Sequence, residues 1–213
     1  ATLLHEIAGP GESVLDEDEK VQEIRRQSET AMAQAQRDHR ALLGLLQPEG
    51  WNGIGEFVDA LGAVSRLRGH LLTLRDFRYI DTAAIDAMTA ALQEAHERVG
   101  TATGEFLAGE KALAPFQQRL IELDARAQKA ASARELADAI EAMQGMAGEL
   151  DMLSELMATL RVDDATQRTR VVDALSAIYA RLNQTRARAT QRRRELGSAE
   201  AVAQFGAQFT LFS

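Results

Sequence analysis

A run of arginines between positions 186 and 194 is the part of this chain with the most evident chemical potential. It contains Arg186, Arg188, Arg192, Arg193 and Arg194, and such a cluster of guanidinium groups can bind the phosphates of a nucleic acid. With about 3.6 residues per turn, a helix would place Arg188 and Arg192 on one flank of its apolar stripe. Arg186 and Arg193 would lie on the opposite flank, and only Arg194 would lie on the outer face. Flanking positions commonly form ion pairs with neighbouring helices, so we expect a structural role, with nucleic-acid binding as the alternative.

The other reactive residue types do not form a recognisable site. The chain has no cysteine, which excludes disulfides, thiolate catalysis and cysteine-ligated zinc. No histidine has a carboxylate three or four positions away, the spacing by which a helix builds a metal site. No phosphate-binding loop, dinucleotide-binding motif or nucleophile elbow occurs. We therefore expect no catalytic, cofactor-binding or metal-binding residue here; the isolated histidines are His5, His39, His70 and His96.

Charge and composition favour a helical protein of the cell interior. The chain has 32 acidic and 24 basic residues and a net charge of −8, so as a whole it does not attract nucleic acid or anionic lipid. Apolar residues make up 46% of the chain but aromatic residues only 5%, a balance typical of helices and coiled coils. No apolar run approaches the roughly 18 residues of a membrane span, and no basic signal-peptide start is visible. We expect a soluble, cytoplasmic protein.

One apolar or small residue recurs at alternating steps of three and four along the middle of the chain. The alternation lasts for about six heptads and is typical of a long helix packed lengthwise against other helices. Pro115 lies within the series without changing its phase, which predicts a kink rather than a break and makes Pro115 a candidate hinge. The series consists of Ile85, Met88, Leu92, Ala95, Val99, Ala102, Phe106, Gly109, Leu113, Phe116, Leu120, Leu123 and Ala127.

The whole pattern predicts an all-α fold, an elongated antiparallel bundle or coiled-coil arm of about five or six long helices. A Gly-Pro-Gly turn would end a short extended lead-in at 1–12. A helical hairpin at 13–80 and one long kinked helix at 81–131 would follow. A second hairpin at 132–197 and a terminal helix at 198–213, cut from a longer chain, would complete the segment.

Charge separates the two helices expected in the second hairpin. Every charged residue from Glu135 to Leu160 is acidic, whereas the following helix is rich in arginine. Antiparallel packing across a short corner would set these charges side by side, so we expect ion pairs between the two helices. Ser132 and Glu135 form a capping box that predicts the start of the first helix, and Asp164 predicts a cap for the second.

An apolar stripe marks the last segment of the chain. Its residues recur at helical spacing, which predicts a helix with one apolar face, either docked on the other helices or available to a partner. Together with the arginines they complete the candidate interaction residues, which are Arg188, Arg192, Arg193, Arg194, Val202, Phe205, Phe209 and Phe212.

Four stretches of the sequence resemble a known family: Leu3–Glu17, Leu71–Asp81, Val162–Arg170 and Arg192–Leu196. Together they are similar to the central region of large bacterial proteins labelled DNA-repair ATPases. In that family a β-rich N-terminal part precedes a long coiled coil, and an AAA-type ATPase module follows towards the C-terminus. The resemblance implies that ATP and Mg²⁺ bind in a part outside this chain, so no nucleotide-binding residue is assigned here.

These observations favour a non-catalytic coiled-coil scaffold or lever of a larger ATPase that mediates partner docking or intramolecular coupling. Its partners would be other domains of the same protein, a protein partner, or a further copy through self-association. One alternative is DNA binding through Arg186–Arg194, which the flanking positions disfavour. Another is an adaptor in a membrane-stress or protein-assembly complex, with Val202–Phe212 as the contact.

Overall fold

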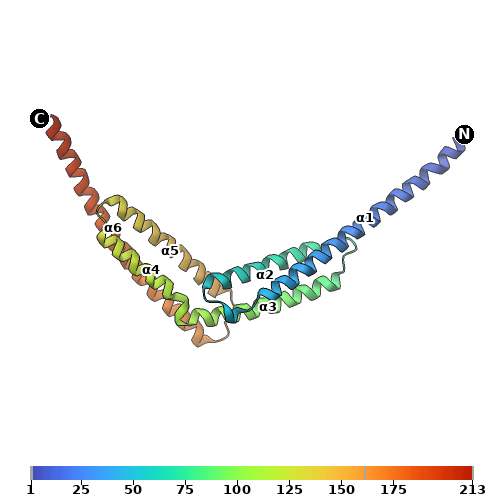
Figure 1. The fold of residues 1–213 in the computed structure, drawn as a ribbon, viewed down its shortest axis with the longest axis horizontal. Coiled ribbons are helices and arrows are strands. Elements are labelled where there is room, and N and C mark those ends of the chain that lie inside the picture. The colour runs from blue at the N-terminus through green and yellow to red at the C-terminus, as the bar shows by residue number, and fades with distance from the viewer. Residues whose placement is uncertain (1, 161, 213) are drawn as a thin grey trace. The chain divides into compact units, whose positions relative to one another are not determined.

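The chain folds into α-helices, as a computed structural model shows for the backbone of residues 2–160 and 162–212. Within these ranges, side chains are described from residue 13 onward. This part of the chain contains no strand, so the predicted all-α class is confirmed. In the described ranges, six α-helices and one short 3₁₀ helix follow one another: α1 (Thr2–Leu45), η1 (Pro48–Gly50), α2 (Ile54–Leu74), α3 (Thr82–Ala108), α4 (Glu110–Lys129), α5 (Ala133–Thr159) and α6 (Ala165–Phe212) (Figure 1).

Two compact units divide the helices between them. The first unit contains the chain up to Trp51 together with Gly55–Val99, and therefore α1, nearly all of α2 and most of α3. The second unit contains Asn52–Ile54 and the chain from Gly100 onward, and therefore the end of α3 with α4, α5 and α6. Each unit has its own buried apolar core.

Apolar residues at helical spacing fill the core of the first unit. α1 contributes small residues to it, Ser28 and Ala35, whereas α2 and α3 supply larger ones. The positions on α2 and α3 agree with the spacing that the sequence predicts for packed helices. They are Phe57, Leu61, Val64, Leu71, Leu74, Ile85, Met88, Leu92, Ala95 and Val99.

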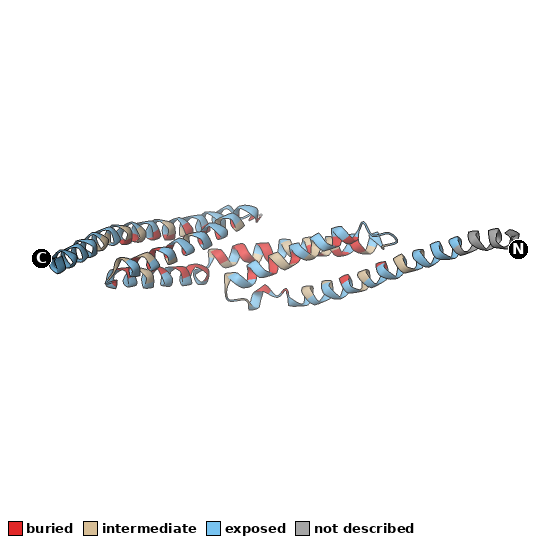
Figure 2. Ribbon diagram, turned by 90° about the horizontal axis from the view of Figure 1, so that it is seen from above, coloured by how far each residue is buried: buried red, intermediate tan, exposed pale blue. Residues whose placement is uncertain are grey.

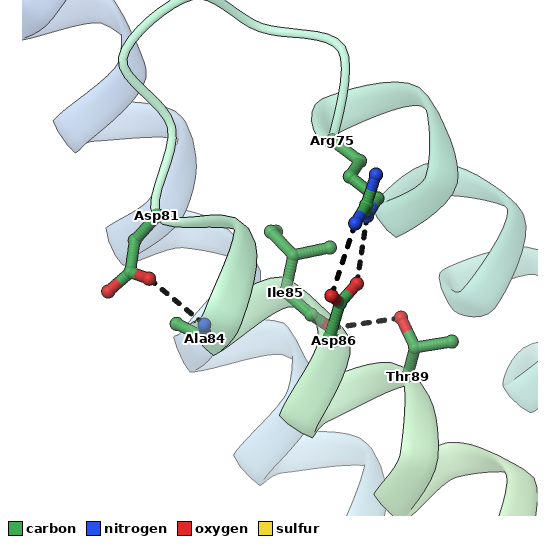
Figure 3. Close-up of polar contacts among 6 residues, drawn as sticks. All are labelled: Arg75, Asp81, Ala84, Ile85, Asp86 and Thr89. Carbon is green, nitrogen blue, oxygen red and sulfur yellow. Dashed lines mark hydrogen bonds and ion pairs between the residues drawn. The ribbon is translucent and has the colours of Figure 1, made fainter.

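Polar contacts in the α2–α3 loop fix the start of α3 (Figure 3). The Asp81 carboxylate accepts a hydrogen bond of 3.1 Å from the backbone N–H of Ala84, which caps the helix. The Arg75 guanidinium donates to both carboxylate oxygens of Asp86, at 2.9 and 3.2 Å. This hydrogen-bonded pair lowers the pKa of Asp86. Because both side chains are exposed, the pair orients the helix more than it stabilises the fold.

In the second unit, α5 and α6 form a hairpin, and α4 packs against both (Figure 1). The Tyr179 hydroxyl donates to the Asp151 carboxylate, and the backbone N–H of Ala133 donates to the Glu200 carboxylate at 3.0 Å. Late residues of α6 thus lie opposite early residues of α5, so the two helices are antiparallel. The buried residues of the two helices are Leu136, Ala139, Ile140, Met143, Met146, Leu150, Leu153, Met157, Val171, Leu175, Ile178, Leu182, Thr185 and Ala189.

Caps encoded in the sequence start both helices of this hairpin. The Ser132 hydroxyl accepts a hydrogen bond of 3.1 Å from the backbone N–H of Glu135. The Glu135 carboxylate in turn accepts one of 2.7 Å from the backbone N–H of Ala131. At the start of α6, the Asp164 carboxylate accepts a hydrogen bond of 3.1 Å from the backbone N–H of Gln167. These contacts confirm the predicted capping box and the predicted cap.

The stretch 81–131 forms two helices, which differs from the single kinked helix that the sequence predicts. α3 ends at Ala108, and α4 begins at Glu110 after Gly109 adopts an extended conformation with φ −82° and ψ 164°. Apart from proline, glycine has the weakest preference for a helix, which lowers the cost of an interruption at Gly109. The candidate hinge, Pro115, lies inside α4.

Two helices extend past their predicted limits. α1 begins at Thr2, where the sequence predicts an extended lead-in and a turn at 1–12. Proline fixes φ close to the helical value, so the Gly-Pro-Gly sequence is compatible with a helix that lacks one hydrogen bond. α6 continues for 48 residues through Gly197, where the sequence predicts a boundary. One glycine inside a helix costs only about 1 kcal/mol, which does not break a helix of this length.

The end of α3 approaches the corner between α5 and α6 closely. A Cβ atom at Gly100 would lie 3.0 Å from Cδ2 of Leu160, and one at Gly104 would lie 3.1 Å from Cγ2 of Val162. Both of these side chains are buried. Glycine at the two positions therefore lets the backbone of α3 reach the corner without a steric clash.

Candidate interaction surface

The Arg192 side chain caps the C-terminal end of α4. Its guanidinium donates hydrogen bonds to the backbone carbonyls of Ala127, at 2.6 Å, of Ala130, at 2.9 Å, and of Gln128. Carbonyls in the last turn of a helix have no partner within that helix, and the negative end of the helix dipole favours a cation there. The half-buried Arg192 side chain thereby joins α6 to α4.

Arg188 lies on the same flank of α6 as Arg192 and also faces α4. Its guanidinium is 3.7 Å from the carboxylate of Asp124, and its side chain is 68% exposed. An exposed ion pair of this kind contributes at most about 1 kcal/mol. Two candidate arginines therefore contact a helix of the same chain, as their flanking positions indicate.

The helix that pairs with these arginines is not the predicted one. The sequence predicts ion pairs between α5 and α6, but in the described residues the ion pair from α6 goes to α4, between Arg188 and Asp124. α5 is also paired with α4, through Glu149 and Arg119. The prediction is wrong because a third helix covers a flank that an isolated two-helix hairpin would leave open.

Arg193 and Arg194 remain on the surface. Both side chains are exposed, and neither forms an ion pair with another described residue. Arg186 is half-buried and donates a hydrogen bond of 3.0 Å to the side chain of Asn183. The cationic surface available to a phosphate ligand near the end of this run is therefore two adjacent arginines, not a continuous stripe.

The apolar residues of the last segment are exposed. The exposed fraction is 71% for Val202, 70% for Phe205, 68% for Phe209 and 94% for Phe212. Every residue from 198 to 212 is exposed, and the end of α6 is pale blue throughout in Figure 2. We refer to these four residues as the tail stripe. The sequence predicts an apolar face that is either docked on the other helices or available to a partner. In the described residues this face is not covered.

The tail stripe lies on a different side of α6 from the buried seam. At about 100° per residue, the seam residues from Val171 to Ala189 point in one direction, and the tail stripe is centred about 180° away. Even at the coiled-coil period of 3.5 residues per turn, the difference stays near 100°. On the seam side, the last sizeable apolar residue is Leu196, which is half-buried, and the small Ala203 and Ala207 follow. α6 thus changes its apolar face near Gly197 although the helix itself is continuous.

Sequence reasoning assigned no candidate site residue to the α2–α3 loop, which carries an exposed aromatic pair. Phe77 and Tyr79 are 43% and 45% exposed. Tyr79 has a positive φ of 64°, a conformation that costs a non-glycine residue roughly 1–2 kcal/mol. The guanidinium carbons of Arg25 and Arg78 lie 4.7 and 5.4 Å from the centre of its ring, and the Ser28 hydroxyl donates to the Arg78 carbonyl. Alternating arginine and aromatic residues were the signal that could have identified this loop.

Two histidines are partly buried in the first unit. Burial lowers the pKa of His39, on α1, below its ordinary value of 6.5, and Nε2 of His39 has no hydrogen-bond partner. Burial also lowers the pKa of His96, on α3, and the positive charge of Arg68 adds to this effect while Glu97 opposes it. The fold therefore favours the neutral form of both side chains.

We expect the first unit to lose stability as the pH falls from about 7.5 to about 5.5. Because the pKa values of His39 and His96 are lower in the folded chain, the unfolded chain binds more protons near and below pH 6.5. Thermal unfolding followed by the fluorescence of Trp51, which belongs to this unit, should give a lower midpoint at the lower pH. The double variant His39→Gln, His96→Gln should show less pH dependence, and an undiminished dependence would contradict the assignment.

Among the side chains described, those of residues 13–160 and 162–212, no group of three or more histidines or carboxylates could hold a metal ion. None of the described helices combines the length and the apolar character needed to cross a bilayer.

A comparison with protein families matches part of the second unit. A family model described as a domain of unknown function (DUF7902) matches residues 111–195, less than half of the chain. This range covers nearly all of α4, all of α5, and α6 as far as Glu195, and it stops before the tail stripe. No curated protein and no solved structure matches the chain. The part of the chain that matches this family model is therefore the three-helix arrangement in which Arg192 joins α6 to α4.

Proposed function

We propose that this chain is a non-catalytic helical scaffold, an elongated coiled-coil arm that presents the tail stripe to a protein partner. Its helical units would serve as spacers or levers between that partner and other parts of the same protein. Support comes from the arrangement of the buried residues along the helices. In both units, apolar residues are buried lengthwise along helices at the spacing of packed rods.

The contrast along α6 is the observation that carries this proposal. Where the helix lies beside α4, Arg188 and Arg192 are used to hold the two helices together. Beyond Gly197, the helix exposes phenylalanine side chains instead. Contiguous exposed apolar surface is a common mark of a protein-binding site. Arg188 and Arg192 thus serve the fold, while the apolar end of the same helix is available for binding.

The link to an ATPase rests on the sequence resemblance alone. In such a protein, the arm would transmit the nucleotide state of an ATPase module to a partner. ATP and Mg²⁺ would bind in that module, so residues of this chain would affect its activity only through docking or coupling.

A DNA titration tests the proposal against its main alternative. We expect the fluorescence anisotropy of a labelled DNA duplex to stay unchanged when the chain is added at about 0.15 M salt. The reason is that the net charge is −8 and that Arg188 and Arg192 contact α4.

Saturable DNA binding that weakens steeply with salt would overturn the proposal if the double variant Arg193→Gln, Arg194→Gln abolished it. This variant leaves the contacts to α4 intact. Its unfolding curve should therefore match that of the unmodified chain, which separates a loss of binding from a loss of folding.

A further inference from the structure

We propose that the partner of the tail stripe is a second copy of this chain, bound antiparallel through the same four residues. The inference rests on the proposed scaffold function and names the partner that this function requires. It is drawn from the side of α6 on which the tail stripe lies, from its spacing, from the charges around it and from its area.

The neighbouring helices do not cover the tail stripe in the described residues. α4 and α5 pack against the seam side of α6, whereas the tail stripe faces roughly the opposite way. α4 ends where Arg192 caps it, and α5 begins at Ala133, opposite Glu200, so neither helix lies beside residues 202–212. The cover must therefore approach α6 from its outer side.

The four residues of the tail stripe are placed symmetrically about Ala207, so their spacing is the same from either end of the stripe. Val202 and Phe212 are equally far from Ala207, and so are Phe205 and Phe209. In an antiparallel pair, Val202 therefore faces Phe212 of the second copy, and Phe205 faces Phe209 of the second copy. A twofold axis makes the two halves of such an interface identical, which is the commonest symmetry among homodimers.

The charges near the tail stripe favour self-pairing in this direction. Residues 201–212 contain no charged side chain, so two tails meet without repulsion. The nearest acidic group, Glu200, already accepts a hydrogen bond from the backbone N–H of Ala133. A parallel pair would bring Arg193 and Arg194 of both copies together, whereas an antiparallel pair keeps them apart. A helix that binds an anionic membrane needs basic residues along its polar face, and residues 201–212 have none.

The area of the tail stripe suits a weak dimer. A phenylalanine side chain buries roughly 150–250 Å², and those of the tail stripe are between 68% and 94% exposed. Pairing two copies would bury on the order of 1,000 Å² in total, close to the lower limit for specific interfaces. We therefore expect reversible association with a Kd on the order of 10 µM.

Sedimentation equilibrium of the whole chain tests this proposal. The mass should rise from 23.3 kDa towards twice that value across concentrations around the expected Kd. The variant Phe205→Glu, Phe209→Glu should weaken association by about a hundredfold or more, because it would place four carboxylates in the interface. The matched control is Leu211→Glu: Leu211 is 85% exposed but lies on the other side of the helix, so its association should equal that of the unmodified chain.

Disulfide formation tests the antiparallel direction, since the chain has no cysteine of its own. Val202→Cys chains mixed with Phe212→Cys chains should form mixed disulfides rapidly. Either variant alone should not, because identical positions at the two ends of the stripe lie far apart in an antiparallel pair. Rapid cross-linking of the Val202→Cys chain with itself would overturn the proposed arrangement.

Two further results would overturn self-pairing itself. One is a single-chain mass at every concentration. The other is binding of the single chain to phosphatidylcholine vesicles. If the Phe205→Glu, Phe209→Glu variant lost this binding, the tail stripe would be assigned to a lipid surface. Neither result involves DNA, so failure of the dimer is distinguishable from failure of the scaffold function. Circular dichroism should show the same helix content in all variants, because the altered side chains are exposed.

Discussion

Replacing Leu182 with alanine is expected to lower the free energy of unfolding of the second unit by about 3 kcal/mol. Leu182 has no exposed surface and lies in the seam between α5 and α6. Truncation removes buried methyl groups and leaves a cavity that two long, packed helices cannot easily close. Urea unfolding followed by circular dichroism measures this loss. Fluorescence of Trp51, the only tryptophan, reports the first unit and should change less.

The matched control for this prediction lies on the same helix. Leu211→Ala removes the same atoms from a side chain that is 85% exposed, so the free energy of unfolding should change by less than about 0.5 kcal/mol. Phe205→Ala should behave in the same way in a dilute, single-chain sample. A loss of similar size at Leu182 and Leu211 would contradict the change of apolar face along α6.

Replacing Arg192 with methionine is expected to cost about 2 kcal/mol of unfolding free energy. The variant keeps much of the apolar stem but removes charge-assisted hydrogen bonds to three carbonyls at the end of α4. A hydrogen bond to a charged group contributes roughly 1.5–3 kcal/mol, and water can compensate part of the loss at a half-buried site. The midpoint of urea unfolding, followed by the helical signal of circular dichroism, measures the effect.

Arg193→Met is the control for Arg192, because it removes the neighbouring arginine from an exposed position. Its effect should stay within about 0.5 kcal/mol. Equal losses for the two variants would mean that the run stabilises the fold through its overall charge and not through the cap on α4. The contrast also shows why Arg193 and Arg194 are the positions to alter in a DNA titration.

Helix type and the starts of α5 and α6 were predictable because their causes are local. The 3-4 spacing of Ile85, Leu92 and Val99 requires only that residues on one face of a helix be apolar. The caps at Ser132 and Asp164 need only a side chain within reach of the next backbone N–H groups. For the same reason, helical angles correctly placed Arg188 and Arg192 on one flank of α6.

Helix ends were less predictable because they depend on small differences in free energy. Gly109, Pro115 and Gly197 each disfavour a helix by about 1–3 kcal/mol, yet only Gly109 interrupts one in the structure. Which of these positions interrupts a helix depends on how the segments on each side are packed.

The sequence by itself determined that this chain is helical, which faces of most helices are apolar, and where several helices begin, because these properties arise within one or two turns. Only the tertiary structure decided that α4 covers the flank of α6 where Arg192 lies, and that the tail stripe has no cover in the described residues. The apolar spacing along a helix indicates which face packs against a neighbour, but not which helix that neighbour is. Apolar burial is non-directional, so the choice depends on the packing of all the helices together.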